Sequence, residues 1–287
     1  MFSLRKTAEQ TASLLPDFVL SAQEIAATLM QGGHHRRVSG AGEKFWQFRP
    51  YTHDDDTRHI DWRQSARQDT VYIRQKELQT HQSFLFWCAG GPSMRFSSRS
   101  DVPEKLHAAQ SLLFALALVF ARTQNAIAPL GMRASSYHAP VLSVLQNALE
   151  SADAALPDPA QLSITRRSHV FLASDFLAPL DEIAQGFEQL AAQTRNGFVF
   201  HIVDPAERHL PYSGRVRFET SDDTPAIEVD HAQDIRDDYL EKMQAHSDGI
   251  RALCEQHGWH YFMHDTSTGA LETLFPAMNI LSAEMSQ

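Results

Sequence analysis

The amino-acid sequence predicts an α/β protein: a doubly wound, mostly parallel sheet with helices on both faces, preceded by an N-terminal extension. Strand-like and helix-like runs alternate through most of the chain, which is typical of this class. The run SFLFWCA is apolar on both faces, as a central strand of a parallel sheet is. With 287 residues, 43% of them apolar, the chain is long enough to bury a core without disulfides.

The N-terminal extension, residues 1–69, is expected to form a helix and a long loop that pack on the main domain, residues 70–287. Apolar residues recur at roughly helical spacing over residues 16–31, which predicts the helix. Residues 40–69 have no clean period and are dense in Trp, Arg and Asp. This composition favours an ordered loop whose contacts are mostly polar.

Strands and helices then follow one another through the main domain. Runs at residues 71–79 and 83–89, separated by a short polar stretch, are predicted to form adjacent strands. The other expected strands are 126–132, 169–175, 197–204 and 259–265, with short strands at 214–218 and 226–230, and the expected helices are 140–151, 179–195, 231–256 and from about Gly269 onward.

One helix is expected to be buried on nearly all sides. Between Ala108 and Ala121 only Gln110 and Ser111 are polar. A bilayer span needs about 20 apolar residues, so this shorter stretch predicts a core helix instead, with Asp101 as its N-cap.

The formal net charge of −10 is divided unevenly along the chain. Residues 1–100 hold 13 Lys and Arg against 10 Asp and Glu, whereas residues 101–287 hold 12 against 25. Nucleic-acid binding requires clustered positive charge, so the composition argues against a nucleic-acid partner.

Two observations predict a cytoplasmic protein. The two cysteines, Cys88 and Cys254, lie in no CxxC pair, which is typical of buried thiols in a reducing compartment. The first residues lead into no unbroken apolar stretch with a cleavage site, so we expect neither a signal peptide nor a membrane span.

A dense acidic cluster near residue 55 offers an enzymatic hypothesis. Clustered carboxylates are the ligands that a hard divalent cation needs for hydrolysis. Arginines on both sides can pair with these carboxylates bidentately and weaken the field for a cation. A metal-dependent hydrolase therefore stays the alternative to an Arg–carboxylate network. The acids are Asp54, Asp55, Asp56 and Asp61, with His59 among them, and the arginines are Arg49, Arg58, Arg63 and Arg67.

Two blocks of the sequence carry a resemblance to a known family. The first block begins at Gly40 and contains GAGEKF, RPY and DDTRHIDWRQSAR, which ends at Arg67. The second begins with HIVDPAE at His201 and continues with Leu210-Pro211 and GRVRF over residues 214–218. These blocks resemble the domain-of-unknown-function 58 (DUF58) family, whose members are related to von Willebrand factor A domains. The resemblance covers about residues 36–265.

The resemblance implies a von Willebrand A-like α/β domain whose genes stand beside those of MoxR-type AAA+ ATPases. We therefore expect a non-enzymatic adaptor or assembly factor that binds such an ATPase or its client and uses no cofactor. Arg and Trp are enriched in interface hot spots, so the first block is the expected docking face, although it could instead lock this loop onto the sheet. The expected interaction residues are Trp46, Arg49, Asp55, Arg58, Asp61, Trp62, Arg63 and Arg67.

The resemblance also implies a metal site that this chain has lost. Many von Willebrand A domains bind a divalent cation through an Asp-x-Ser-x-Ser turn after the first central strand. The aligned turn has Ala89 in place of the Asp and Gly91 in place of the first Ser. Ser93 keeps its hydroxyl, and Asp175 is expected nearby, but a hard cation needs about six oxygens. We expect a vestigial site that holds no metal.

Overall fold

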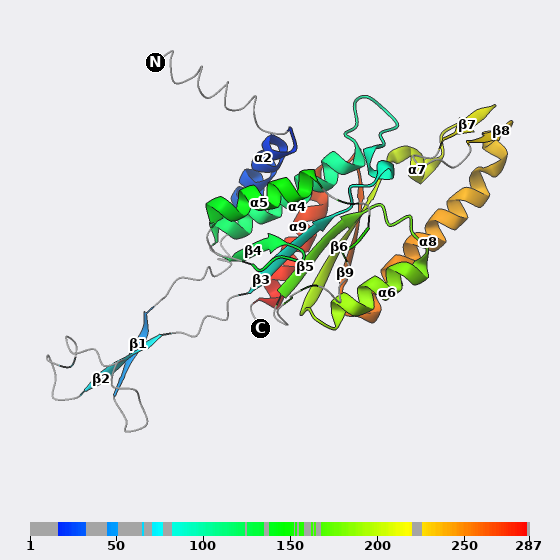
Figure 1. The fold of residues 1–287 in the computed structure, drawn as a ribbon. Coiled ribbons are helices and arrows are strands. Elements are labelled where there is room, and N and C mark those ends of the chain that lie inside the picture. The colour runs from blue at the N-terminus through cyan, green and yellow to red at the C-terminus, as the bar shows by residue number, and fades with distance from the viewer. Residues whose placement is uncertain are drawn as a thin grey trace, which may run out of the picture. The chain divides into compact units, whose positions relative to one another are not determined.

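The computed structural model describes residues 17–32, 45–50, 65, 71–76, 82–123, 125–134, 138–151, 153, 155–157, 162, 164, 168–219 and 226–285. The chain divides into a main unit, Met1–Val38 with Gln82–Gln287, and a small unit, Ser39–His81. This division differs from the expected boundary at residues 69 and 70. The predicted N-terminal helix, α2 (Asp17–Gly32), belongs to the main unit, where it packs against α4 (Lys105–Arg122) (Figure 1).

In the small unit, β1 (Phe45–Pro50) pairs antiparallel with β2 (Tyr72–Lys76). The expected loop over residues 40–69 therefore contains a strand at its start. The prediction that the runs at 71–79 and 83–89 are adjacent strands is wrong, because β2 takes its backbone hydrogen bonds from β1. The run at 83–89 forms a strand of the separate five-stranded sheet of the main unit.

The main unit holds a five-stranded parallel sheet, as predicted. Its strands, in sequence order, are β3 (Ser83–Cys88), β4 (Ala126–Pro129), β5 (Ser168–Ser174), β6 (Asn196–Val203) and β9 (His260–Asp265). Their order in space is β4-β3-β5-β6-β9, and each neighbouring pair is parallel. The chain moves outward from β3 to β4 and then returns past β3 to β5. The direction of winding therefore reverses between β3 and β5.

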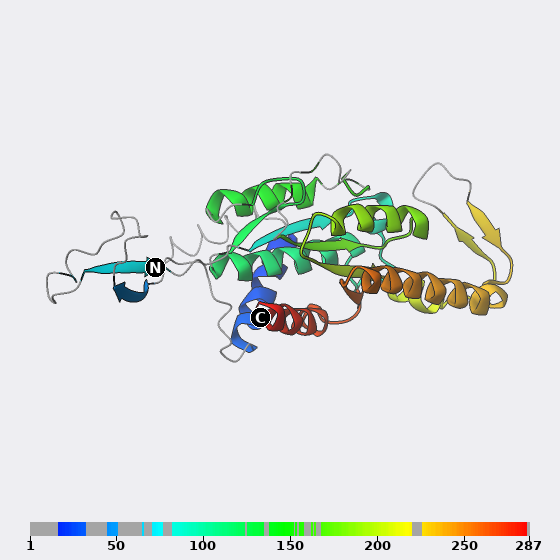
Figure 2. The ribbon, with the colours of Figure 1, turned by 90° about the horizontal axis from the view of Figure 1, so that it is seen from below.

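Two hydrophobic cores lie on the two faces of this sheet. α2, α4, α5 (His138–Glu150) and α9 (Ala270–Glu284) contribute to one of them. α6 (Leu180–Ala191) and α8 (Arg236–Gln256) contribute to the other. Figure 2 shows α2, in blue, beside α9, in red, in agreement with their contacts. The predicted helices on both faces are therefore confirmed.

The connection from β6 to β9 carries the additional elements. It holds a short helix, α7 (Pro205–His209), and an antiparallel hairpin of β7 (Val216–Phe218) and β8 (Ile227–Val229). Figure 1 shows α7 and the hairpin near the start of α8. The two short strands agree with the sequence prediction, whereas α7 was not expected.

Stacked phenylalanines fill the first core. The ring of Phe171 lies 4.9 Å from that of Phe198, 5.2 Å from that of Phe86 and 5.5 Å from that of Phe120, between ring centroids. Side chains alternate between the two faces of a strand, so Phe171 points into this core while Val170 points into the other.

Helix α4 is long and apolar enough to cross a membrane by length and composition, but 78% of its residues are buried inside the main unit. The core helices of proteins without a membrane segment meet the same criteria. The burial agrees with the prediction of a core helix.

A histidine lies inside the stacked core. His169 on β5 is only 1% exposed, and its ring stacks on Phe84 with centroids 5.4 Å apart. Neither ring nitrogen has a hydrogen-bond partner among the described residues. Burial lowers the pKa of His169 to about 4, and the charge of Arg195 acts in the same direction. Burial also lowers the pKa of His201 and His264 to about 4.

The protein is therefore expected to lose stability in acid. In the unfolded chain these imidazoles take up a proton near pH 6.5, but in the folded chain they do so only near pH 4. Their contribution to the free energy of unfolding is therefore complete above pH 6.5 and falls as the pH falls towards 4. His169→Phe keeps the ring stack and removes one titrating group. Urea unfolding should show that the free energy of unfolding of this variant falls by about 3 kcal/mol less than that of the wild type between pH 7 and pH 4. An equal decrease of the free energy of unfolding in both proteins would show that His169 does not cause the loss of stability in acid.

Candidate functional site

The carboxyl ends of β3, β5 and β6 lie along one edge of the main sheet. In doubly wound sheets, ligands bind at this edge, where the direction of winding reverses. β3 leads into the turn from Ala89 to Ser93, β5 leads into Asp175, and β6 leads into Asp204. The backbone amide of Ala89 still donates to the carbonyl of Ala173 at 2.9 Å, which holds the turn against β5.

A buried ammonium group lies among these strand ends. Lys105 is 0% exposed, and its Nζ lies 3.0 Å from Oδ2 of Asp175 and 2.5 Å from Oε1 of Glu207. The same Nζ lies 5.9 Å from the centroid of the Phe96 ring. The ammonium therefore faces two carboxylates and one aromatic face, which compensate for its removal from water.

Lys105 reaches this place because it is the first residue of α4. The helix begins after a loop that follows the turn, and the amide of Lys105 donates to the carbonyl of Phe96 at 3.1 Å. The expected N-cap was wrong: Glu104 takes that position, while Asp101 pairs with Arg99. A helix N-terminus disfavours positive charge, so the buried Lys105 depends on its carboxylate partners.

Glu207 is positioned by a capping box that its own sequence encodes. In the segment Asp204-Pro-Ala-Glu207, Oδ1 of Asp204 accepts from the amide of Ala206 at 2.7 Å, and Oε2 of Glu207 accepts from the amide of Asp204 at 2.9 Å. Oδ2 of Asp204 accepts from the amide of Ser98 at 2.9 Å, which ties this segment to the loop before α4. One oxygen of Glu207 therefore holds the helix start and the other holds Lys105.

Asp175 is followed by a residue in a strained backbone conformation. Phe176 has a φ of 45°, which is rare for a bulky side chain. Its amide donates to Oγ of Ser174 at 3.0 Å, and its ring packs edge-on against Phe187 at 5.9 Å. Residues in such conformations are often found at functional sites, where the surrounding structure holds them.

The turn and its surroundings do not fit a divalent cation. Ala89 and Gly91 have no side-chain oxygen, and Oδ2 of Asp175 is bonded to Lys105. Ser93 and Asp175 line the same cavity of about 580 Å³, so the structure brings these two predicted residues together. Among the described residues, no group of three or more His, Cys, Asp or Glu is arranged to hold a metal ion.

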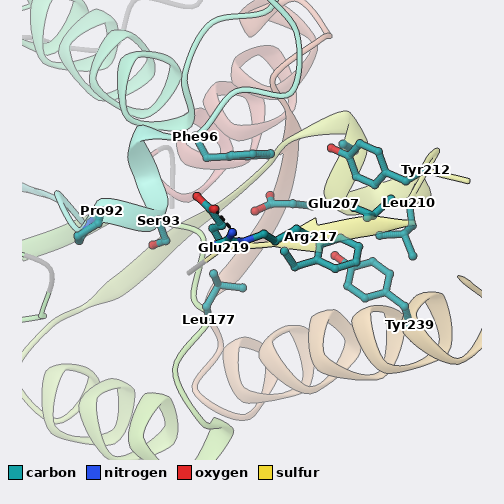
Figure 3. A pocket seen from close by; sticks show the side chains of 13 residues that line it. Pro92, Ser93, Phe96, Leu177, Glu207, Leu210, Tyr212, Arg217, Glu219 and Tyr239 are labelled. Carbon is teal, nitrogen blue, oxygen red and sulfur yellow. Dashed lines mark ion pairs between the residues drawn. The ribbon is translucent and has the colours of Figure 1, made fainter. Parts of the chain in front are cut away.

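A larger pocket opens beside this cluster. It has a volume of about 850 Å³, and Ser93, Phe96, Leu177, Glu207 and Tyr239 are among its lining residues. Phe96 is 39% exposed and Leu177 is 55% exposed, so two large apolar side chains of the lining face solvent. In Figure 3, Phe96 lies above and Leu177 below the ion pair between Arg217 and Glu219. The pocket therefore presents apolar and aromatic surface to solvent at the ligand-binding edge of the sheet.

A tyrosine of the pocket and the cysteine that ends β3 both hold their protons tightly. Burial, followed by the charge of Glu207, raises the pKa of Tyr239 to about 12, so this phenol stays protonated at neutral pH. Burial and the charge of Asp175 raise the pKa of the Cys88 thiol, which makes it a weak nucleophile. No histidine lines either cavity among the described residues, so Ser93 has no imidazole base there.

The other sequence-predicted site residues fall in or beside the small unit. Trp46 and Arg49 lie on β1, where Arg49 is in register with Ile73 of β2. The remaining six interaction residues and the acids of the proposed hydrolase cluster lie outside the residues that the structure describes. They are Asp55, Arg58, Asp61, Trp62, Arg63 and Arg67, with Asp54 and Asp56.

Sequence reasoning missed the central residue of the site. Lys105 stands three residues before the apolar stretch that begins at Ala108, and no sequence motif gives it a role. Its signal was a basic residue at the first position of a mostly apolar helix, where both burial and the helix dipole disfavour a positive charge. That combination indicates a buried partner of opposite charge.

Comparison with known families identifies one match. The family model described as protein of unknown function DUF58 matches residues 47–249. No curated protein matches the chain.

Proposed function

The chain belongs to the DUF58 family, and we propose that it is a non-enzymatic protein-interaction module. In this proposal it acts as an adaptor or assembly factor for a MoxR-type AAA+ ATPase, or for that ATPase's client. It would do so in the cytoplasm and without a cofactor.

The exposed apolar pocket is the observation that carries this proposal. Large exposed apolar patches on soluble domains mark interaction sites. Phe96 and Leu177 are exposed apolar side chains of the lining, and Tyr212 and Tyr239 add further aromatic area to it. Tyrosines and other aromatic side chains are enriched in the cores of protein interfaces. A partner side chain that fills this pocket would bury surface that now faces water.

The position of the pocket supports a von Willebrand A-like interpretation of the domain. The turn from Ala89 to Ser93 follows β3, a central strand of the sheet, and the pocket is lined by Ser93 from that turn. In this proposal the domain binds its partner at the edge where related domains carry a cation. The expected residues of the first block, among them Trp46 and Arg49, would form a second contact surface.

A metal-dependent hydrolase is not favoured. That hypothesis needs the acids near residue 55, which lie outside the described residues, and nothing in the described part of the chain adds to it. The cluster that the structure does describe has an ammonium group between its carboxylates.

The proposal predicts that a charge at the mouth of the pocket weakens binding to the ATPase. The test uses the full chain and the purified MoxR-type ATPase of the same cells, held in its ATP-bound state by a variant that cannot hydrolyse ATP. Leu177→Asp places a carboxylate on the apolar surface, so we expect the affinity measured by fluorescence anisotropy to fall at least about tenfold.

Met132→Asp is the matched control, because Met132 is 50% exposed and does not line the pocket. It should bind as the wild type does. Failure of the wild-type chain to bind the ATP-bound ATPase would overturn the ATPase as its direct partner. Equal binding by Leu177→Asp and the wild type would overturn the proposed surface.

A further inference from the structure

The carboxylates at the carboxyl edge of the sheet surround an ammonium group that belongs to the chain itself. Asp175 follows β5, Glu207 belongs to α7 after β6, and Lys105 starts the helix after β3. We propose that the Lys105 ammonium is a built-in cation that occupies the place of a divalent metal, and that its removal would convert this cluster into a divalent-cation site. This inference is independent of the proposed function.

The ammonium of Lys105 and its two carboxylate partners are largely buried. The Lys105 side chain is 0% exposed, and those of Asp175 and Glu207 are 7% and 21% exposed. An ammonium has three N–H donors. Two point to the carboxylates at 3.0 and 2.5 Å, and the Phe96 ring lies on a further side at 5.9 Å. A metal ion therefore has no room among these groups while Lys105 is present.

The groups around the ammonium are suited to a hard cation once it is removed. Asp175 and Glu207 approach from two different elements and leave an oxygen each for a common ligand. Asp175 lines one of the two cavities and Glu207 lines the other, so water can reach both carboxylates. Two carboxylates and water molecules form an all-oxygen ligand set, which Mg²⁺ and Mn²⁺ prefer.

The absence of other ligands in the turn agrees with this assignment. A cation held from the turn would need oxygens at the positions of Ala89 and Gly91, and neither residue supplies one. A lysine tethered to α4 needs no ligands there, because its position is set by the helix. Its pairing with the two carboxylates also explains why a lysine is tolerated at a helix N-terminus, where the helix dipole disfavours a positive charge.

The test compares three forms of the full chain: the wild type, Lys105→Ala, and a triple variant in which Lys105→Ala is combined with Asp175→Asn and Glu207→Gln. Thermal unfolding is measured in MnCl₂ and in EDTA, and bound Mn²⁺ is counted by electron paramagnetic resonance. At Mn²⁺ about 100-fold above Kd, Lys105→Ala should melt roughly 5–10 °C higher than in EDTA and hold one ion. The wild type and the triple variant should respond in neither measurement.

Two results would overturn the proposal. One is a Lys105→Ala chain that responds to Mn²⁺ no more than the wild type does. If Lys105→Ala does not fold in EDTA, its refolding from urea is followed by near-ultraviolet circular dichroism with and without Mn²⁺. Recovery only with Mn²⁺ supports the proposal. Failure in both conditions, while the triple variant folds, is the second result that would overturn it.

Discussion

Asp175→Asn is expected to lower the free energy of unfolding by about 3 kcal/mol, because it leaves a buried ammonium with one carboxylate fewer. Nζ of Lys105 is 3.0 Å from Oδ2 of Asp175, and both side chains are almost wholly buried. Asn keeps the shape of the side chain, so the change tests charge and not packing. Urea unfolding at neutral pH measures the loss.

Two further variants make this result interpretable. Asp153→Asn changes an exposed acid and should alter stability by no more than about 0.5 kcal/mol. Adding Lys105→Met to Asp175→Asn removes the uncompensated ammonium and should recover part of the loss, since residues in contact show interaction energies of about 0.5–3 kcal/mol. A double variant no more stable than Asp175→Asn alone would show that the uncompensated ammonium is not the cause of the loss.

Phe171→Ala is expected to cost about 3–5 kcal/mol of unfolding free energy. Phe171 is 1% exposed, and its ring contacts those of Phe86, Phe120 and Phe198, whose centroids lie within 5.5 Å. Removing it opens a cavity between the sheet and α4, and stacked rings relax poorly into such a space. Chemical unfolding of the purified chain measures the change.

Phe171→Leu provides the graded comparison for this cavity. Leu keeps most of the apolar volume, so its loss should be clearly smaller than that of Phe171→Ala. Because α4 also carries Lys105, the cavity variant should loosen the site as well as the core. Equal losses for Ala and Leu would mean that the loss comes from the ring contacts and not from the apolar volume that Leu retains, which would contradict the cavity explanation.

Local sequence determined most of the secondary structure of the main unit. Strands such as β5 and β6 are recognisable because they are apolar on both faces, and the capping box at Asp204 and Glu207 lies within four consecutive residues. The departures of Ala89 and Gly91 from the metal-binding turn are likewise visible in the sequence. Each of these features depends on neighbours along the chain.

Strand partners were decided by the tertiary structure. Residues 71–79 and 83–89 follow one another in sequence, yet β2 pairs with β1 and β3 pairs with β4 and β5. A run of residues with strand character does not specify its partner, because backbone hydrogen bonds are the same for every sequence. The short length of the polar stretch between the two runs therefore did not predict which strands pair.

The site also depended on the tertiary structure. Lys105 meets Asp175 and Glu207 across 70 and 102 residues of chain, and no local pattern encodes such distances. The expected N-cap Asp101 pairs with Arg99, and α4 begins at Lys105 after Glu104. The sequence by itself determined that the turn lacks metal ligands. Only the folded chain decided that Lys105 lies beside that turn, because the cost of burying its charge is offset only where folding brings carboxylates into contact with it.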